Sequence, residues 1–274
     1  MTGHETGHER LAAVLRAMPA PVVAVSGGVD SVTLAVLAHR LRGDARMVHA
    51  ASPAVPRAAT QRLRRLAATE GWTLAVIDAG EMADPRYRAN PVNRCYFCKV
   101  NLYATITRLA AAGAAEQVVS GANLDDLGDY RPGLQAAREH GVRHPYVEAG
   151  LDKAQVRALA RQLGLGGIAE LPASPCLSSR IETGIAVTAR RLALIEAVEA
   201  WLAVSWRAEL ARCRVRAGGI EVEFGPDEMA RARGQPDLIA RLREAVPALG
   251  HMPVAIGPYR RGSAFLHDGG ANAR

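Results

Sequence analysis

Residues 26–31 read Ser-Gly-Gly-Val-Asp-Ser and combine two adjacent glycines with two hydroxyls and one carboxylate. Glycine lets the backbone turn tightly and brings N–H groups close to a ligand. A helical pattern begins at residue 29, and the start of a helix offers N–H groups and a positive dipole end to an anion. We therefore expect a phosphate cradle made by Ser26, Gly27, Gly28 and Ser31. Asp30 fits either metal binding or positioning of the helix start.

Three of the four cysteines have a spacing that suits a metal site. Cys95 and Cys98 form a Cys-x-x-Cys pair, and Cys176 follows in the segment SPCLSSR. In a reducing compartment this count favours metal binding or catalysis over disulfides. Three thiolates can bind three irons of a [4Fe–4S] cluster and leave the fourth iron open for an extra sulfide. Two alternatives stay open: zinc with His144 or His49 as fourth ligand, and structural cysteines without metal.

Alternating strand and helix patterns over about the first 165 residues must position these groups. Such alternation predicts an open, mostly parallel α/β sheet, with ligands at the carboxyl ends of the strands. An amphipathic helix at 152–165 has an Asp cap and ends at Gly164. The expected strands are 21–26, 46–52, 72–78 and 117–121, and the other expected helices are 29–41, 56–71 and 97–112.

The pattern changes from about residue 175. Two short strands, 212–217 and 220–224, are separated by Gly218-Gly219, which predicts a hairpin. We expect a smaller α+β domain here and place the boundary in the loop at 172–184, which gives domains 1–172 and 173–274. Cys213 lies in an alternating strand pattern and should be a core residue. The remaining elements expected in this domain are helices at 188–203 and 235–245 and a strand at 253–256.

Composition favours a globular protein, because 49% of the 274 residues are hydrophobic. The N-terminus has no apolar run typical of a signal peptide, and no apolar stretch is long enough to span a membrane, so we expect a cytoplasmic protein without a membrane partner. The net charge of +7 suits nucleic acid or a small phosphorylated substrate. Aromatic residues at only 4% argue against nucleic acid. The densest basic run, 62–70, is interpreted as an exposed helix face.

The glycine turn lacks the lysine of the GxxxxGK[ST] loop and does not match GxGxxG, which disfavours P-loop kinases and dinucleotide-binding proteins. It resembles the PP-loop of the ATP pyrophosphatase superfamily, whose pattern is SGGxDS. The resemblance implies an adenine nucleotide alpha hydrolase-like fold, cleavage of ATP between its α and β phosphates, and an adenylated intermediate. Mg²⁺ is expected because the departing pyrophosphate must be neutralised.

Two further segments fit an adenylating site. Ser52 follows the second strand, where the superfamily places adenine contacts. The segment GANLDDLGDY at 121–130 follows the fourth strand and contains several carboxylates that could hold Mg²⁺ or cap a helix. We assign Ser52, Gly121 and Asp125 of these segments to the nucleotide site, together with Arg131, which directly follows the second segment.

Four segments together resemble the LarE family of sulfur transferases: the PP-loop, NPVNRCYFCK at 90–99, residues 128–165 with DYRPG, and ASPCLSSRIETG at 173–184. The resemblance implies that the chain adenylates a carboxylate of pyridinium-3,5-biscarboxylic acid mononucleotide. A sulfur nucleophile then displaces AMP and leaves a thiocarboxylate, toward the nickel-pincer nucleotide. One branch of the family sacrifices a cysteine, and another carries three cysteines and is thought to use an iron–sulfur cluster. Cys95, Cys98 and the catalytic Cys176 match the second branch.

The same resemblance implies a substrate pocket lined by cations and hydroxyls, since the substrate bears a phosphate and carboxylates. It also implies a homo-oligomer and other nickel-pincer biosynthesis enzymes as partners. The chain departs from the family at 182–183, where Glu-Thr replaces the usual Pro-Tyr of SRIPYG. The residues implied to bind the substrate are Ser179, Arg180, Glu199, Arg214 and Arg216.

The main alternative is a PP-loop tRNA 2-thiolation enzyme, because some of these also combine the loop with three cysteines and a cluster. The positive charge would suit tRNA. Val29 stands where that group usually has lysine, and the chain lacks a nucleic-acid-binding appendage and carries DYRPG. An amide-forming synthetase would not explain three cysteines, and a non-enzymatic nucleotide sensor would release no pyrophosphate.

Overall fold

The computed structural model describes residues 6–111, 116–128, 132–173 and 175–266. The chain forms two compact units. The first comprises Met1–Glu81 and Cys95–Ser174, and the second comprises Met82–Arg94 and Pro175–Arg274. The segment at 82–94 thus groups with the C-terminal part of the chain, which no sequence pattern indicated.

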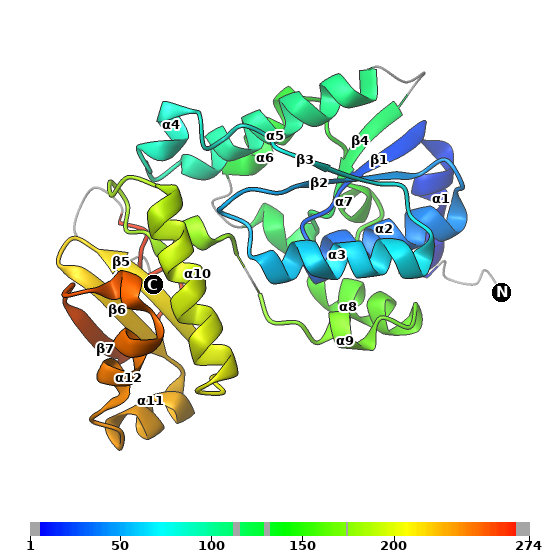
Figure 1. Cartoon of the computed structure of the whole chain (residues 1–274). Helices are drawn as coiled ribbons and strands as arrows, with labels where there is room; N and C mark the ends of the chain where they lie inside the picture. The colour runs from blue at the N-terminus through cyan, green and yellow to red at the C-terminus, as the bar shows by residue number, and fades with distance from the viewer. Residues whose placement is uncertain (1–5, 112–115, 129–131, 174, 267–274) are drawn as a thin grey trace. The chain divides into compact units, whose positions relative to one another are not determined.

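The first unit is built on a four-stranded parallel sheet with the strand order β3-β2-β1-β4 (Figure 1). This arrangement confirms the predicted parallel α/β sheet, and each strand lies within two residues of its predicted bounds. Parallel sheets are covered on both faces, which is why these strands consist largely of apolar residues. The strands are Ala20–Ala24 (β1), Arg46–Ala50 (β2), Leu74–Ile77 (β3) and Glu116–Ser120 (β4).

Successive side chains of these strands enter two separate cores. Val23 and Val119 belong to one core, whereas Val22 and Val118 belong to the other, because neighbouring residues of a strand point to opposite faces. Helices α5 (Arg94–Ala111) and α6 (Pro132–Glu139) cover the second face. The first face is covered by α1 (Gly7–Ala17), α2 (Val29–Leu41), α3 (Arg57–Glu70), α7 (Pro145–Glu148), α8 (Lys153–Gln162) and α9 (Gly166–Ala169).

The second unit contains a three-stranded sheet with the order β5-β6-β7. Strands β5 (Ala211–Arg216) and β6 (Gly219–Phe224) form the predicted antiparallel hairpin, and β7 (Val254–Pro258) pairs with β6 in parallel. This mixed sheet confirms the smaller α+β arrangement. Its helical segments are α4 (Pro85–Arg88), α10 (Ala189–Val204), α11 (Pro226–Arg233), α12 (Leu238–Ala245) and the 3₁₀ turns η2 (Leu177–Arg180) and η3 (Pro247–Leu249).

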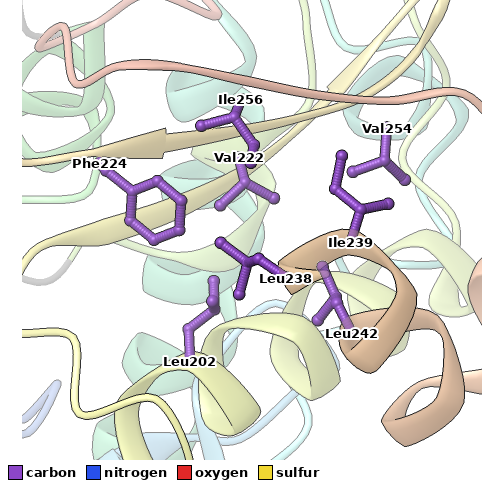
Figure 2. Close-up of a pocket in the computed structure, with 8 residues that line it drawn as sticks. All are labelled: Leu202, Val222, Phe224, Leu238, Ile239, Leu242, Val254 and Ile256. Carbon is purple, nitrogen blue, oxygen red and sulfur yellow. The ribbon is translucent and has the colours of Figure 1, made fainter. Parts of the chain in front are cut away.

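One face of this sheet is apolar. Cys213 is fully buried, as predicted for a core residue, and burial raises the pKa of its thiol, so it stays protonated and unreactive. A small pocket between α10, α12, β6 and β7 has a lining made only of apolar side chains, so it offers no group for chemistry (Figure 2). The residues that line it are Leu202, Val222, Phe224, Leu238, Ile239, Leu242, Val254 and Ile256.

In the described part of the chain, none of the helices combines the length and the apolar character needed to cross a bilayer.

His49 is a buried link within the first unit. Its Nδ1 lies 2.9 Å from the carbonyl oxygen of Val25, and its Nε2 lies 2.8 Å from the hydroxyl of Thr60. A carbonyl oxygen can only accept, so Nδ1 carries the proton and Nε2 accepts from Thr60. Burial lowers the pKa of His49, so the ring is neutral in the folded protein.

Acidification should therefore destabilise the fold through His49. In the unfolded chain the ring protonates near pH 6.5, whereas the folded protein keeps it neutral to lower pH. The unfolded state then binds more protons, so the free energy of unfolding falls as the pH drops below about 6.5. Denaturant unfolding between about pH 7.5 and about pH 5.5 should show a smaller fall for His49→Gln than for the wild type. Equal falls would contradict this.

Candidate functional site

The glycine turn between β1 and α2 is closed by the two serines. The Ser31 hydroxyl accepts from the backbone N–H of Ser26 at 3.0 Å and contacts the Gly28 carbonyl at 3.2 Å. The Ser26 and Ser31 hydroxyls lie 3.1 Å apart. Gly27 has a φ of 83°, a left-handed conformation that favours glycine. The sequence pattern therefore produces a tight turn whose hydroxyls are already oriented.

Helix α2 begins directly after this turn. Its N-cap residue, Gly28, supplies no side-chain hydrogen bond to the first N–H groups of the helix. Those N–H groups also have no intrahelical partner, because the hydrogen-bond ladder starts only with the bond from Val32 N–H to the Gly28 carbonyl. The arrangement leaves backbone N–H groups and the positive end of the helix dipole for an anion.

Asp30 is held by residues far away in the sequence. Its carboxylate forms an ion pair with the ammonium of Lys153 and accepts a hydrogen bond from the Asn123 side chain at 3.3 Å. The Tyr146 hydroxyl donates to the Asp30 carbonyl at 2.9 Å. These contacts hold Asp30 at the start of α2. Lys153, the first residue of α8, brings to the glycine turn the positive charge that the turn lacks in sequence.

The segment after β4 folds against the same turn. Asn123 caps the 3₁₀ turn η1 (Leu124–Leu127): its side chain accepts from Asp125 N–H, and Asp126 accepts from Asn123 N–H. A Cβ atom on Gly121 would lie 2.9 Å from backbone atoms of Asp30 and Ser31, so glycine is required there. Gly121 thus allows the segment to pack directly on the start of α2.

The remaining predicted nucleotide residues lie in different settings. The Ser52 hydroxyl, just after β2, accepts from the Ala54 N–H at 3.2 Å. The Asp125 carboxylate is 3.4 Å from the backbone nitrogen of Lys153. Arg131 and Asp129 lie outside the described residues. Among the residues that the structure describes, no three side chains of His, Cys, Asp or Glu form a group that could hold a metal ion.

Cys95 and Cys98 lie in the first turns of α5, which begins three residues before its predicted start. Residues three apart in a helix share one face, so the Cys-x-x-Cys spacing places both thiols on the same side. Both cysteines are partly exposed, as is Cys176, and none of these thiols forms a disulfide. Cys95 and Cys98 belong to the first unit and Cys176 belongs to the second.

Cys176 is the N-cap of the 3₁₀ turn η2, and Arg180 closes this turn. The Arg180 guanidinium donates to the carbonyls of Pro175 and Cys176 at 2.7 and 3.3 Å. It also makes a two-pronged pair with Glu199 of α10, with N–O distances of 3.0 and 3.1 Å. Glu199 in turn accepts from the Cys213 N–H at 3.1 Å. The predicted residues Arg180 and Glu199 thus fix the backbone that carries Cys176.

Residues 82–94 hold the same turn from another side. The Tyr87 and Ser178 hydroxyls lie 2.5 Å apart. Arg94 donates to the Ser178 carbonyl at 3.0 Å, and Asn90 donates to the Glu182 carbonyl at 2.8 Å. Ser178 is completely buried by these contacts. The segment that directly precedes Cys95 in the chain is therefore part of the support of the Cys176 turn.

The other two predicted arginines lie on the polar face of the β5-β6 hairpin. Arg214 pairs with Glu223 at 2.8 Å and donates to the Ser179 carbonyl at 3.2 Å. Arg216 lies 2.8 Å from Glu221 and 3.2 Å from Glu223. The side chains of Arg214 and Glu223 are 5% and 0% exposed, so this pair is shielded from water. The structure thus brings Ser179, Arg180, Glu199, Arg214 and Arg216 into one hydrogen-bonded network.

The departure at 182–183 also joins this network. Glu182 lies 3.5 Å from Arg216. The Thr183 hydroxyl accepts from the Leu266 N–H at 3.1 Å and contacts the Ala264 carbonyl at 3.3 Å. The replacement therefore adds a carboxylate beside a predicted substrate arginine and ties the turn to the last described segment.

Comparison with known proteins identifies relatives over most of the chain, although no family model matches it. Over 194 residues, 70% of each chain, it is 31% identical to the pyridinium-3,5-bisthiocarboxylic acid mononucleotide synthase of Lactiplantibacillus plantarum. It is 41% identical to the uncharacterized protein slr1717 of Synechocystis over 182 residues, 66% of this chain and 68% of that protein. The chain belongs to the LarE family. The uncharacterized protein MJ0830 of Methanocaldococcus jannaschii is also similar, at 26% identity over 181 residues.

Sequence reasoning missed several residues of this LarE-family chain that the structure places next to predicted ones. Lys153 directly follows Asp152, the N-cap of α8. The helix dipole disfavours a cation at this position, so a lysine here is unusual and could have been noticed. Glu221 and Glu223 alternate on β6 opposite the arginines of β5, a cross-strand charge pattern that could have been found. Tyr87 and Arg94 had no comparable signal.

Replacing Gly121 by alanine should disturb the start of α2. The new Cβ would lie 2.9 Å from the Asp30 carbonyl carbon and the Ser31 nitrogen, and backbone atoms cannot move aside cheaply. We expect a loss of about 1–3 kcal/mol in the free energy of unfolding. Gly128→Ala is the matched control, since its Cβ would meet only the Asp125 carbonyl oxygen at 3.8 Å. Denaturant unfolding of both variants checks this, and equal stabilities would contradict it.

Proposed function

We propose that this LarE-family chain is an ATP-dependent sulfur transferase. It would adenylate a carboxylate of pyridinium-3,5-biscarboxylic acid mononucleotide, release pyrophosphate, and convert the adenylate to a thiocarboxylate with release of AMP. The observation that carries the proposal is the 31% identity to the L. plantarum synthase over 70% of both chains.

The first unit supplies what adenylation requires. The uncapped N–H groups at the start of α2 and the Lys153 ammonium present positive potential where pyrophosphate would form. Asp30 holds Lys153, so the ammonium is positioned before ATP binds. Mg²⁺ would accompany ATP, and Asp30 and Asp125 are the carboxylates of the turn and its neighbouring segment that could share it with phosphate oxygens.

The sulfur would be delivered through Cys95, Cys98 and Cys176. Three partly exposed thiols are soft ligands, which fits iron–sulfur binding better than binding of a hard ion. A [4Fe–4S] cluster held by these thiolates would supply sulfide as the nucleophile. Arg94, which directly precedes Cys95 in the chain, donates to the turn that carries Cys176.

The substrate would be bound by the arginine network of the second unit. Each of Arg180, Arg214 and Arg216 already faces a glutamate, so the phosphate of the substrate must replace a carboxylate to gain a guanidinium. Arg216 is the best placed for this exchange, because its side chain is 17% exposed and that of Arg214 only 5%.

The proposal predicts that the anaerobic protein, given ATP, Mg²⁺ and the biscarboxylic mononucleotide, forms AMP, pyrophosphate and a thiocarboxylate. Lys153→Met should slow pyrophosphate release by about 10²-fold, since it removes one charge stabilising the leaving group. Arg161→Gln on the same helix is the control, because it loses the same charge from an exposed pair. Mass spectrometry and a pyrophosphate assay provide the readout. Pyrophosphate release with tRNA but not with the mononucleotide would favour the thiolation alternative.

Iron counting tests the cysteine assignment. The anaerobic protein should contain about four irons per chain, and Cys95→Ala, Cys98→Ala and Cys176→Ala should each lose them. Cys213→Ala should keep them, because that thiol is buried in the core. Iron retained in the first three variants would rule out the cluster site. If no iron binds and only Cys176→Ala stops transfer, the chain should become about 34 Da lighter during the reaction, with one H₂S lost at Cys176.

A further inference from the structure

The basic helix α3 contacts the glycine turn through one of its arginines. Residues 62–70 were expected to form an exposed face, and Arg64 and Arg65 are indeed exposed. Arg62 is half-buried instead, and its guanidinium donates to the Gly27 carbonyl at 2.8 Å. Burial and the nearby Arg65 lower the pKa of Arg62, yet the group remains charged. The proposed reaction assigns no role to the bond between Arg62 and the Gly27 carbonyl.

The bond from Arg62 fixes the peptide group between Gly27 and Gly28. In a trans peptide the C=O and N–H point in opposite directions, so holding the carbonyl on one side directs the Gly28 N–H to the other. The Gly28 nitrogen lies 3.5 Å from the Ser26 hydroxyl, longer than an ordinary N–H···O hydrogen bond. This N–H is therefore available to an anion. A cation on the carbonyl also polarises the peptide and strengthens its N–H as a donor.

Helix α3 supports the turn at two further points. A Cβ on Gly27 would lie 3.1 Å from the Cβ and carbonyl oxygen of Ala59, so α3 packs directly against the turn. His49 also joins α3 to the end of β1, because it bridges the Thr60 hydroxyl and the Val25 carbonyl. Helix α3 thus contacts the turn at Gly27 and the residue before the turn through His49, and Arg62 is the charged member of these contacts.

We propose that Arg62 is a positioning residue for pyrophosphate: it holds the Gly27–Gly28 peptide so that the Gly28 N–H faces the leaving phosphates. The proposal deepens the proposed function and rests on it for the identity of the anion. Arg62 acts through the peptide rather than by touching the phosphates. Loss of the bond should weaken pyrophosphate binding and leave AMP binding, which does not use this peptide, nearly unchanged.

The test compares Arg62→Gln, Arg62→Lys and Arg65→Gln in the full chain. Isothermal titration with inorganic pyrophosphate and with AMP, and the KM for pyrophosphate in ATP–pyrophosphate exchange, are the readouts. Arg62→Gln should weaken pyrophosphate binding about tenfold, with kcat changed less than KM. Arg62→Lys should recover part of the affinity, because an ammonium can still donate to the carbonyl. Arg65→Gln removes the same charge from the same helix and should match the wild type.

Equal effects of Arg62→Gln and Arg65→Gln would overturn the proposal, since they would show a general charge effect. Equal losses of pyrophosphate and AMP affinity in Arg62→Gln would also overturn it, because they would show a damaged fold. If Arg62→Gln does not fold, Arg62→Lys is used instead, and a loss of AMP affinity as large as its loss of pyrophosphate affinity would overturn the proposal. Absence of exchange by the wild type with any acid would refute the proposed function alone, because titration with pyrophosphate still decides the role of Arg62.

Discussion

The backbone N–H groups at the start of α2 have no partner within the helix and no capping side chain, and the first unit is organised around this deficit. Gly121 allows the segment after β4 to pack on these residues, and α3 holds the preceding carbonyl. Lys153 arrives from a position 123 residues later and pairs with Asp30. An anion bound at this point would supply the partner that these N–H groups lack.

The second unit differs from the first, because it buries charged side chains in its interior. Arg214 and Glu223 are almost completely buried, and a buried ion pair is stabilising only when its hydrogen bonds are complete. The carbonyls of Ser179 and Arg260 complete the bonds of Arg214. The network therefore holds the 3₁₀ turn of Cys176 in place through bonds from Arg180 and Arg214.

The sequence predicted the parallel sheet and the hairpin well, because buried strands and glycine turns have strong local patterns. The glycine turn and the paired positions of Cys95 and Cys98 were equally evident from short motifs. Lys153 was missed because its partner, Asp30, is far away in the sequence and no local period reveals such a contact. The grouping of residues 82–94 with the C-terminal unit was missed for the same reason, since it depends on bonds from Tyr87 and Arg94 to Ser178. The pairing of each arginine with a particular glutamate was not predicted either, because it depends on contacts between β5, β6 and α10 rather than on a local pattern.

The grouping of residues 82–94 with the C-terminal unit limits how the two units could be exchanged between proteins. A C-terminal piece that begins at residue 173 would lack Tyr87, Asn90 and Arg94, which support the turn of Cys176. The two units are therefore interleaved in the gene, and recombination at a single junction cannot exchange one of them intact. A piece exchanged at residue 173 alone would therefore carry Cys176 without the side chains that hold its turn.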